Sequence, residues 1–304
     1  MPPVRLRSDR CRTAAIVGAL ALVACLVPAL QPTGSAHADV TLNCNGNDQR
    51  SAVDKLPRPG VIIVDHEDDG TYYLPATIDD DGTLDDVSLN PALDDATTPL
   101  VSVWQNGTAC DGDEFTRNGW AVTPSGQVLG DDSQDGPAAG FYSDASGLPL
   151  NRPVVGMSPT ATGNGYWLVA SDGGIFTYGD AVFRGSTGNL RLNKPVVGMS
   201  VTPTGGGYWM VATDGGIFSF GDAPFYGSTG NLRLNQPITG MTTTPSGHGY
   251  WMVASDGGIF TFGDAPFYGS TGGRRLTAPI AGMVPNGAGY TLIGQDGQLY
   301  PFHP

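Results

Sequence analysis

One sequence of about forty residues is written three times in this chain, and this repetition restricts the fold more than any other feature. The first two copies are identical at 32 of 42 positions. Weaker copies precede and follow them, and an earlier segment, 59–98, resembles a further degenerate copy. The copies are 99–152, 153–194, 195–236, 237–278 and 279–304. A chain of this kind folds as an array of similar units, each covering its neighbour.

Each copy predicts four short strands. "PVVGMS", "GYWMVAT", "GIFSFG" and "PFYGS" are rich in β-branched and aromatic residues, and Gly, Pro, Asp and Asn separate them. "TDGG" and "SDGG" are typical of tight hairpin turns, in which Gly adopts positive φ. No segment shows helical periodicity with caps. Four antiparallel strands in about 42 residues have the size of a propeller blade, so we expect an all-β protein, a β-propeller of four-stranded blades.

The aromatic residues of each copy have two interpretations. A blade has two apolar faces and cannot bury both alone, so repeated rings are expected to pack between neighbouring blades. They could instead be platforms for sugars. We favour packing, because positions at strand centres lie between sheets. The residues concerned are Trp167, Trp209, Trp251, Phe176, Phe218 and Phe260.

The short last copy suggests how the ring closes. Segment 279–304 supplies three strands, and a strand from the N-terminal region could supply the fourth. "DVTLN" at 39–43 fits if 59–98 is itself a blade, which gives six blades. Otherwise "VIIV" or "YYLPA" could close a ring of five. Cys44 and Cys110 are expected to form a disulfide bond that fixes this seam, since both follow a signal sequence for an oxidising compartment.

The first 38 residues have the features of a secretory signal. A basic start precedes an apolar run, and Ala36 and Ala38 form a small-x-small cleavage site. No later apolar run is long enough to cross a bilayer. "LVAC", ending at Cys25, also resembles a lipoprotein signal, but the chain stays apolar after it. We therefore expect a freely secreted protein, with lipid anchoring at Cys25 as the alternative.

Charge excludes some partners. Residues 1–38 hold four arginines and Asp9, so the remainder carries 11 basic and 28 acidic residues. Most of the acidic residues precede residue 153. Nucleic acid requires a basic surface, so we do not expect it as a partner. Acidity also keeps a secreted protein soluble, and we expect a monomer.

The motif "GYWxVAxDGGIFxFGDAxFYGSxG" resembles the repeat of secreted actinobacterial β-propeller proteins. The likeness covers 153–278 closely, and 99–152 and 279–304 loosely. It implies secretion and a propeller. In that group the repeat often accompanies cell-wall hydrolase domains, but the repeat itself implies little about activity. We find no separate catalytic domain, because 39–98 is short and strand-like.

Loop order places two repeated polar groups on one face. In a four-stranded meander, the turn after the second strand and the link after the fourth open on the same side. This face is expected to carry Asp172, Asp214, Asp256, Arg191, Arg233 and Arg275. Such groups can bind a sugar or a peptide. In the alternative interpretation, which we favour, each Asp caps its hairpin and each Arg pairs with an Asp of the neighbouring blade.

The sequence signals for calcium binding and for catalysis are weaker. "TIDDDGTLD" places Asp79, Asp81 and Asp85 at ligand positions of a calcium loop, but it lacks the first Asp and the last Glu. A solvated acidic loop is the favoured interpretation, and we expect no cofactor. We also find no GxSxG or HExxH motif.

The sequence thus predicts a secreted, non-catalytic module that binds cell-wall or extracellular glycan or protein. The alternatives are a hydrolytic, glycoside-active propeller using Asp residues of the N-terminal units, and a structural module without a small ligand.

Overall fold

The structure is a computed structural model and describes residues 58–59, 61–67, 70–78, 84–86, 99–111, 114–130 and 141–304. This part of the chain consists of strands, turns and loops, and contains no helix. Its strands form six antiparallel sheets, one with four strands and five with three. The prediction of an all-β fold is therefore confirmed for the described residues.

The sheets follow the order of the chain. The four-stranded sheet has the order β1-β5-β6-β7, formed by β1 (Arg58–Pro59), β5 (Ser102–Asp111), β6 (Glu114–Val122) and β7 (Val128–Gly130). An N-terminal sheet contains β2 (Val61–Glu67), β3 (Gly70–Ile78) and β4 (Leu84–Asp86). The next two sheets contain β8 (Val154–Pro159), β9 (Gly165–Ala170) and β10 (Ile175–Gly179), then β11 (Val196–Val201), β12 (Gly207–Ala212) and β13 (Ile217–Gly221). The last two contain β14 (Ile238–Thr243), β15 (Gly249–Ala254) and β16 (Ile259–Gly263), then β17 (Ile280–Asn286), β18 (Gly289–Gly294) and β19 (Leu299–Phe302).

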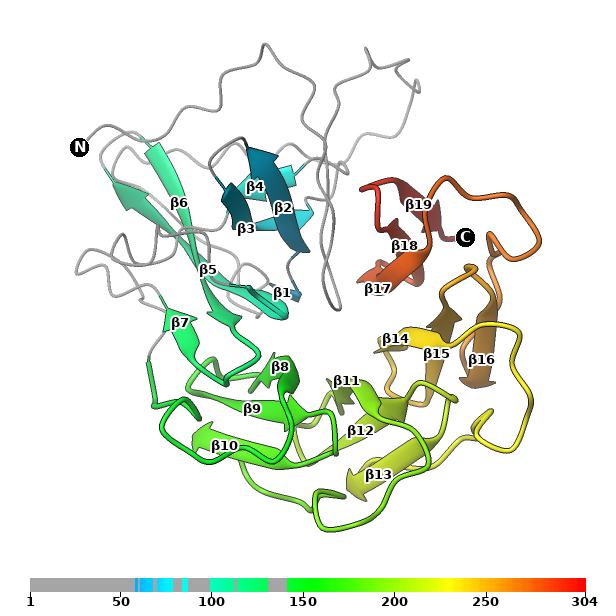
Figure 1. Ribbon diagram of the computed structural model, residues 1–304, viewed down its shortest axis with the longest axis horizontal. Coiled ribbons are helices and arrows are strands. Elements are labelled where there is room, and N and C mark those ends of the chain that lie inside the picture. The colour runs from blue at the N-terminus through cyan, green and yellow to red at the C-terminus, as the bar shows by residue number, and fades with distance from the viewer. Residues whose placement is uncertain are drawn as a thin grey trace.

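The sheets of the repeats lie side by side in an arc around a common centre (Figure 1). Strands β8, β11, β14 and β17 line the inside of the arc and contact one another in that order. The β5–β7 sheet continues the arc, because β5 contacts β8. Each of the four repeat sheets begins directly after its predicted proline: Pro153, Pro195, Pro237 and Pro279. This is how blades are arranged in a β-propeller.

In the three close copies, 153–278, which the structure describes throughout, the predicted fourth strand is absent, and this part of the prediction is wrong. After β10 the chain turns and runs back as an irregular segment, which we call the strap (180–187, with equivalents 222–229 and 264–271). The strap bonds to side chains instead of a strand. Trp167 Nε1 donates to the carbonyl oxygen of Val182 at 3.0 Å. The Tyr208 hydroxyl donates to the carbonyl oxygen of Gly185 at 2.6 Å and accepts from the backbone N–H of Arg184 at 3.1 Å.

At each of the four joints that the structure describes between β6 and β18, a Trp from one sheet is buried against a Tyr from the next. Side chains of a strand point alternately to the two faces of its sheet. Tyr208 therefore faces the preceding sheet, where its ring centroid lies 6.1 Å from that of Trp167. Trp209 faces the following sheet and lies 5.9 Å from Tyr250. Trp167, Trp209 and Trp251 are at most 1% exposed, which confirms the prediction that they pack between sheets.

Ring closure differs from what we expected of "VIIV" and "YYLPA". These segments lie in β2 and β3, which pair with each other and with β4. Among the described residues, no N-terminal strand pairs with β17–β19, and the two-residue strand β1 pairs with β5 instead. The segment "DVTLN" lies outside the described residues. The insertion that holds Cys110 lengthens the β5–β6 hairpin, which remains paired as far as Asp111 and Glu114.

Candidate functional site

The turn after each middle strand and the link that follows each strap lie together, as loop order predicts. Thr187, at the end of the first strap, donates its backbone N–H to the carbonyl oxygen of Gly173 at 3.0 Å. Its hydroxyl also donates to the carbonyl oxygen of Asp172 at 3.1 Å. We call this side of the arc the turn–link face; its links are 188–194, 230–236 and 272–278. Repetition therefore presents the same surface at successive joints.

The repeated aspartates of the turn–link face cap their own hairpins. The Oδ1 atoms of Asp172, Asp214 and Asp256 each accept a hydrogen bond from the backbone N–H two residues later, at 3.0 Å. An Asp that bonds backbone in this way holds a turn. Half of the interpretation that we favoured, in which these carboxylates are structural, therefore agrees with the geometry.

The second half of that interpretation, in which each link arginine pairs with an Asp of the neighbouring blade, does not agree with the geometry. Arg191, Arg233 and Arg275 are exposed. Among the described residues, none of the three forms an ion pair or a side-chain hydrogen bond. The guanidinium groups of the links are therefore available to bind from solvent, while the nearby carboxylates are occupied by backbone groups.

The predicted calcium loop, disulfide bond, cleavage site and lipid-anchor cysteine lie largely outside the described residues. Asp79, Asp81, Cys44, Ala36 and Ala38 fall outside the described residues, as does Cys25. Asp85 lies in β4 and Cys110 in β5, but the structure describes only their backbone. Within the described part of the chain, no group of three or more His, Cys, Asp or Glu side chains is placed to hold a metal ion.

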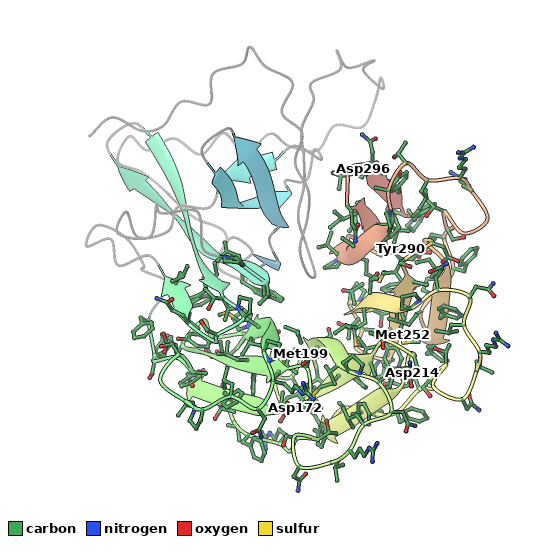
Figure 2. The ribbon with its side chains drawn as sticks, in the orientation of Figure 1. Asp172, Met199, Asp214, Met252, Tyr290 and Asp296 are labelled. Atoms are coloured by element: carbon green, nitrogen blue, oxygen red, sulfur yellow. The ribbon has the colours of Figure 1, made fainter. Side chains whose placement is uncertain are left out.

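The inner strands enclose a cavity of about 520 Å³ at the centre of the arc. Figure 2 shows Met199 on the inner strand β11, facing this region. Each inner strand of the repeats has a bulge, as between Val196 and Gly198, and a Cβ added to Gly198 would meet open space. The lining that the structure describes consists of Gly, Val, Ala, Met, Ser, Thr, Pro and Trp, with no titratable side chain. This wall offers hydroxyl and backbone groups, and supplies no acid or base.

On the opposite side from the turn–link face, a second set of aspartates, one in each of the three close copies, ties its own sheet together. Asp222 accepts hydrogen bonds from Thr202 at 2.9 Å and Thr204 at 2.5 Å. Asp264 accepts from Thr244 and Ser246 in the same way, and these bonds lower the pKa of its carboxyl. These residues were not among the candidates predicted from the sequence, although "GD" follows the third strand in all three close copies.

Each strap also exposes a phenylalanine that sequence reasoning missed. Phe183, Phe225 and Phe267 are 55%, 61% and 61% exposed, and Phe141 occupies the equivalent place before them at 61%. They stand 42 residues apart, so repetition carries them along the arc as a row. The error followed from assigning "PFYGS" to a strand. Exposed rings of this kind can stack on a sugar or contact an apolar partner.

The tyrosines at the joints are held neutral. Burial is the main cause that raises the pKa of Tyr208, Tyr250 and Tyr290 above the ordinary value. Their hydroxyl groups therefore keep the proton that they donate to the straps. These groups are structural and lie away from the exposed turn–link face.

Comparison with known proteins gives structural likeness only. No protein-family model and no curated protein matches the chain. Among solved structures, the β-propeller domain of Cps50 (Swd1) from Myceliophteria thermophila is similar with 11% identity and a TM-score of 0.40, over 59% of this chain and 59% of that domain. A protein of unknown function from Bacteroides thetaiotaomicron is similar with 12% identity and the same TM-score, over 81% of this chain and 69% of that one.

The described residues form no helix that is long and apolar enough to cross a membrane.

Proposed function

We propose that this protein is a secreted, non-catalytic module that binds glycan of a cell wall or another extracellular surface through its turn–link face. The observation that carries the proposal is the repeated link arginine. Arg191, Arg233 and Arg275 are exposed and unpaired among the described residues, at equivalent places on three successive units. Secretion rests on the signal-like residues 1–38.

Repetition favours binding over catalysis. An active site requires one asymmetric arrangement of groups, whereas the turn–link face repeats the same arrangement. Equivalent weak sites on one rigid scaffold bind a polymeric surface together, and their combined avidity exceeds that of one site without any new contact. A planar guanidinium can hold carboxylate or sugar hydroxyl groups by paired hydrogen bonds. A glycan polymer matches both features, because it repeats as the protein does.

Replacement of the three arginines by serine, singly and together, tests the proposal. Binding to isolated cell wall and to a glycan array is measured, together with the melting temperature. Single variants should weaken binding modestly, and the triple variant should abolish it without changing the melting temperature. A second triple variant replaces Phe183, Phe225 and Phe267 by serine and so tests the straps as the alternative surface. Loss of binding in this variant, with binding kept in the arginine variant, would assign the site to the straps.

Two results would contradict the proposal. If the triple arginine variant unfolds, these arginines are structural ties. If it stays folded and binds as before, the turn–link face is the wrong surface.

A further inference from the structure

A hollow on the turn–link face marks the joint between the last two sheets. Its volume is about 410 Å³. The link before β17 supplies Arg274, Arg275 and Thr277. The β18–β19 hairpin supplies Asp296, Gln298 and Tyr300, and Figure 2 labels Asp296 on this sheet. The hollow therefore combines two guanidinium groups with a carboxylate, an amide and a phenol.

Four residues that line this hollow differ from the residues at the equivalent places in the other copies. All four have a polar side-chain group. Arg274 stands where the two preceding links have Leu, and Thr277 where they have Asn. Gln298 and Tyr300 stand where the facing hairpins of the earlier joints have Gly and Phe. The residues at the equivalent places are Leu190, Asn193, Gly216 and Phe218 in one joint, and Leu232, Asn235, Gly258 and Phe260 in the next.

The position of these four residues distinguishes them from the changes that are common in terminal units. Terminal units of repeat arrays differ from internal ones mainly on the surface that no neighbour covers. Here Arg274 and Thr277 belong to the link that follows the third close copy, and Gln298 and Tyr300 belong to the last sheet. The four changes meet across a covered joint, and all of them line one hollow.

The hollow has a net charge that suits a monoanion. Arg274 and Arg275 are exposed and form no ion pair with any described residue. Asp296 accepts hydrogen bonds from the Thr277 hydroxyl and, at 3.2 Å, from the backbone N–H of Gln298. Its carboxylate is thus engaged within the protein. Two arginines and one aspartate leave one positive charge for a ligand to neutralise.

The phenol of Tyr300 remains a hydrogen-bond donor here. Burial, followed by the nearby charge of Asp296, raises its pKa, while a hydrogen bond with Thr277 opposes this. A neutral phenol can donate to a ligand oxygen and offers a ring face to a sugar.

We propose that this hollow binds the carboxylate-bearing ring of a uronic acid residue. The guanidinium groups would hold the carboxylate, since their planar geometry matches it. The Gln298 amide and the Tyr300 phenol would bind ring hydroxyl groups. Apart from Leu276, every residue of the lining carries a polar side-chain group, and the ring of Tyr300 adds an apolar surface on which a sugar ring can stack. This site occurs at one joint and shares Arg275 with the repeated face proposed above, whereas Arg274, Gln298 and Tyr300 belong to the hollow alone.

Titration calorimetry of the full chain with D-galacturonate tests the inference, with D-galactose, inorganic phosphate and N-acetyl-glutamate as comparison ligands. We expect one site per chain for galacturonate, and binding of galactose weaker by about tenfold or more, because loss of hydrogen bonds to charged groups has an effect of this order. Phosphate that binds as tightly would show an unspecific anion patch, and N-acetyl-glutamate that binds more tightly would show a peptide site. Either result overturns the inference.

Three variants use the chain's own repeats. Arg274→Leu and Tyr300→Phe restore residues that other joints carry, so both should keep the wild-type melting temperature. We expect Arg274→Leu to weaken galacturonate binding about tenfold or more, and Tyr300→Phe to weaken it less. Leu232→Arg is the matched control, because it creates an arginine pair at a joint without Gln or Tyr. A second galacturonate site in this variant, or unchanged binding by Arg274→Leu, would refute the inference.

If galacturonate binds while the triple arginine variant of the repeated face still binds cell wall, only the proposed function fails. Arg275 lines both sites, so galacturonate binding is measured on the wild-type chain and on the double variant of Arg191 and Arg233, in which every residue of the hollow is unchanged and the two proposals can fail separately.

Discussion

Removing one oxygen atom from Tyr208 should weaken the chain at a joint without changing its packing. In Tyr208→Phe the buried ring stays, while the hydroxyl that donates to Gly185 and accepts from Arg184 is lost. A typical intramolecular hydrogen bond contributes about 0.5–1.5 kcal/mol net, so two of them predict a loss of about 2 kcal/mol in the free energy of unfolding. This corresponds to a factor of roughly 30 in the unfolding equilibrium.

The matched control is Tyr268→Phe. Tyr268 is half-buried on a strap, and its hydroxyl forms no hydrogen bond with any described residue. The same chemical change should therefore alter the free energy of unfolding by about 0.5 kcal/mol or less. Urea unfolding followed by tryptophan fluorescence measures both variants, since Trp167 lies against Tyr208 and reports on the joint.

Hydrogen exchange gives a second, local measurement. The backbone N–H of Arg184 should exchange faster in Tyr208→Phe than in the wild-type protein, while the N–H groups of β12 should not. If the two Tyr→Phe variants are equally stable, or if exchange at Arg184 is unchanged, the strap is held by packing and our reasoning about it is wrong.

Three further predictions concern backbone strain and pH. Ser143 has φ of 107° where the repeats have glycine, so Ser143→Gly should raise the free energy of unfolding by about 1 kcal/mol, measured by urea denaturation. Gly215 has φ of 75°, and a Cβ at this position would lie 1.8 Å from the Thr229 hydroxyl oxygen, so Gly215→Ala should lower the melting temperature strongly. Gly205 has φ of 68°, but a Cβ there would meet no atom within 4 Å, so Gly205→Ala should lower the melting temperature less. The joint tyrosines have a pKa above that of the unfolded chain, so their stabilising contribution is complete below about pH 10 and is lost as pH rises through the folded-state pKa. The part of the phenolate absorbance that Tyr208→Phe removes should therefore rise together with unfolding; its appearance in a chain that stays folded would contradict this.

The repeats made much of the fold predictable from the sequence. Strand starts follow the prolines, and Trp209 had to be buried because it occupies a strand centre in an array whose sheets cover one another. The hairpin role of Asp214 was also foreseen as an alternative, since "DGG" is a local turn signal. These features depend on a few neighbouring residues and on the spacing of the repeats, and both are visible in the sequence.

The fourth strand was not predictable in the same way. "PFYGS" has strand-like composition, but the partners of each strap are the indole of its own sheet and the phenol of the next. The latter stands more than twenty residues further along, and no local pattern records it. The composition of such a segment indicates a tendency to form a strand, but its tertiary contacts determine whether the strand forms.

The hollow at the last joint was missed for a different reason. The predictions relied on residues that the copies have in common, whereas Arg274, Gln298 and Tyr300 differ from their equivalents in the other copies. A comparison of the copies position by position could have found all three. Their meeting in one place required the three-dimensional structure, because 24 residues separate Arg274 from Gln298.

The matching of joints bears on how such a protein can change its length. A Trp from one sheet meets a Tyr from the next at every described joint from β6 to β18. A gene that loses or gains one 42-residue copy by recombination would therefore encode a chain whose new neighbours still fit. Copy number can change in this way without redesign of these contact surfaces, whereas the hollow at the last joint requires both the link 272–278 and the final sheet. If both proposals hold, avidity depends on the number of units and specificity on this single terminal pair.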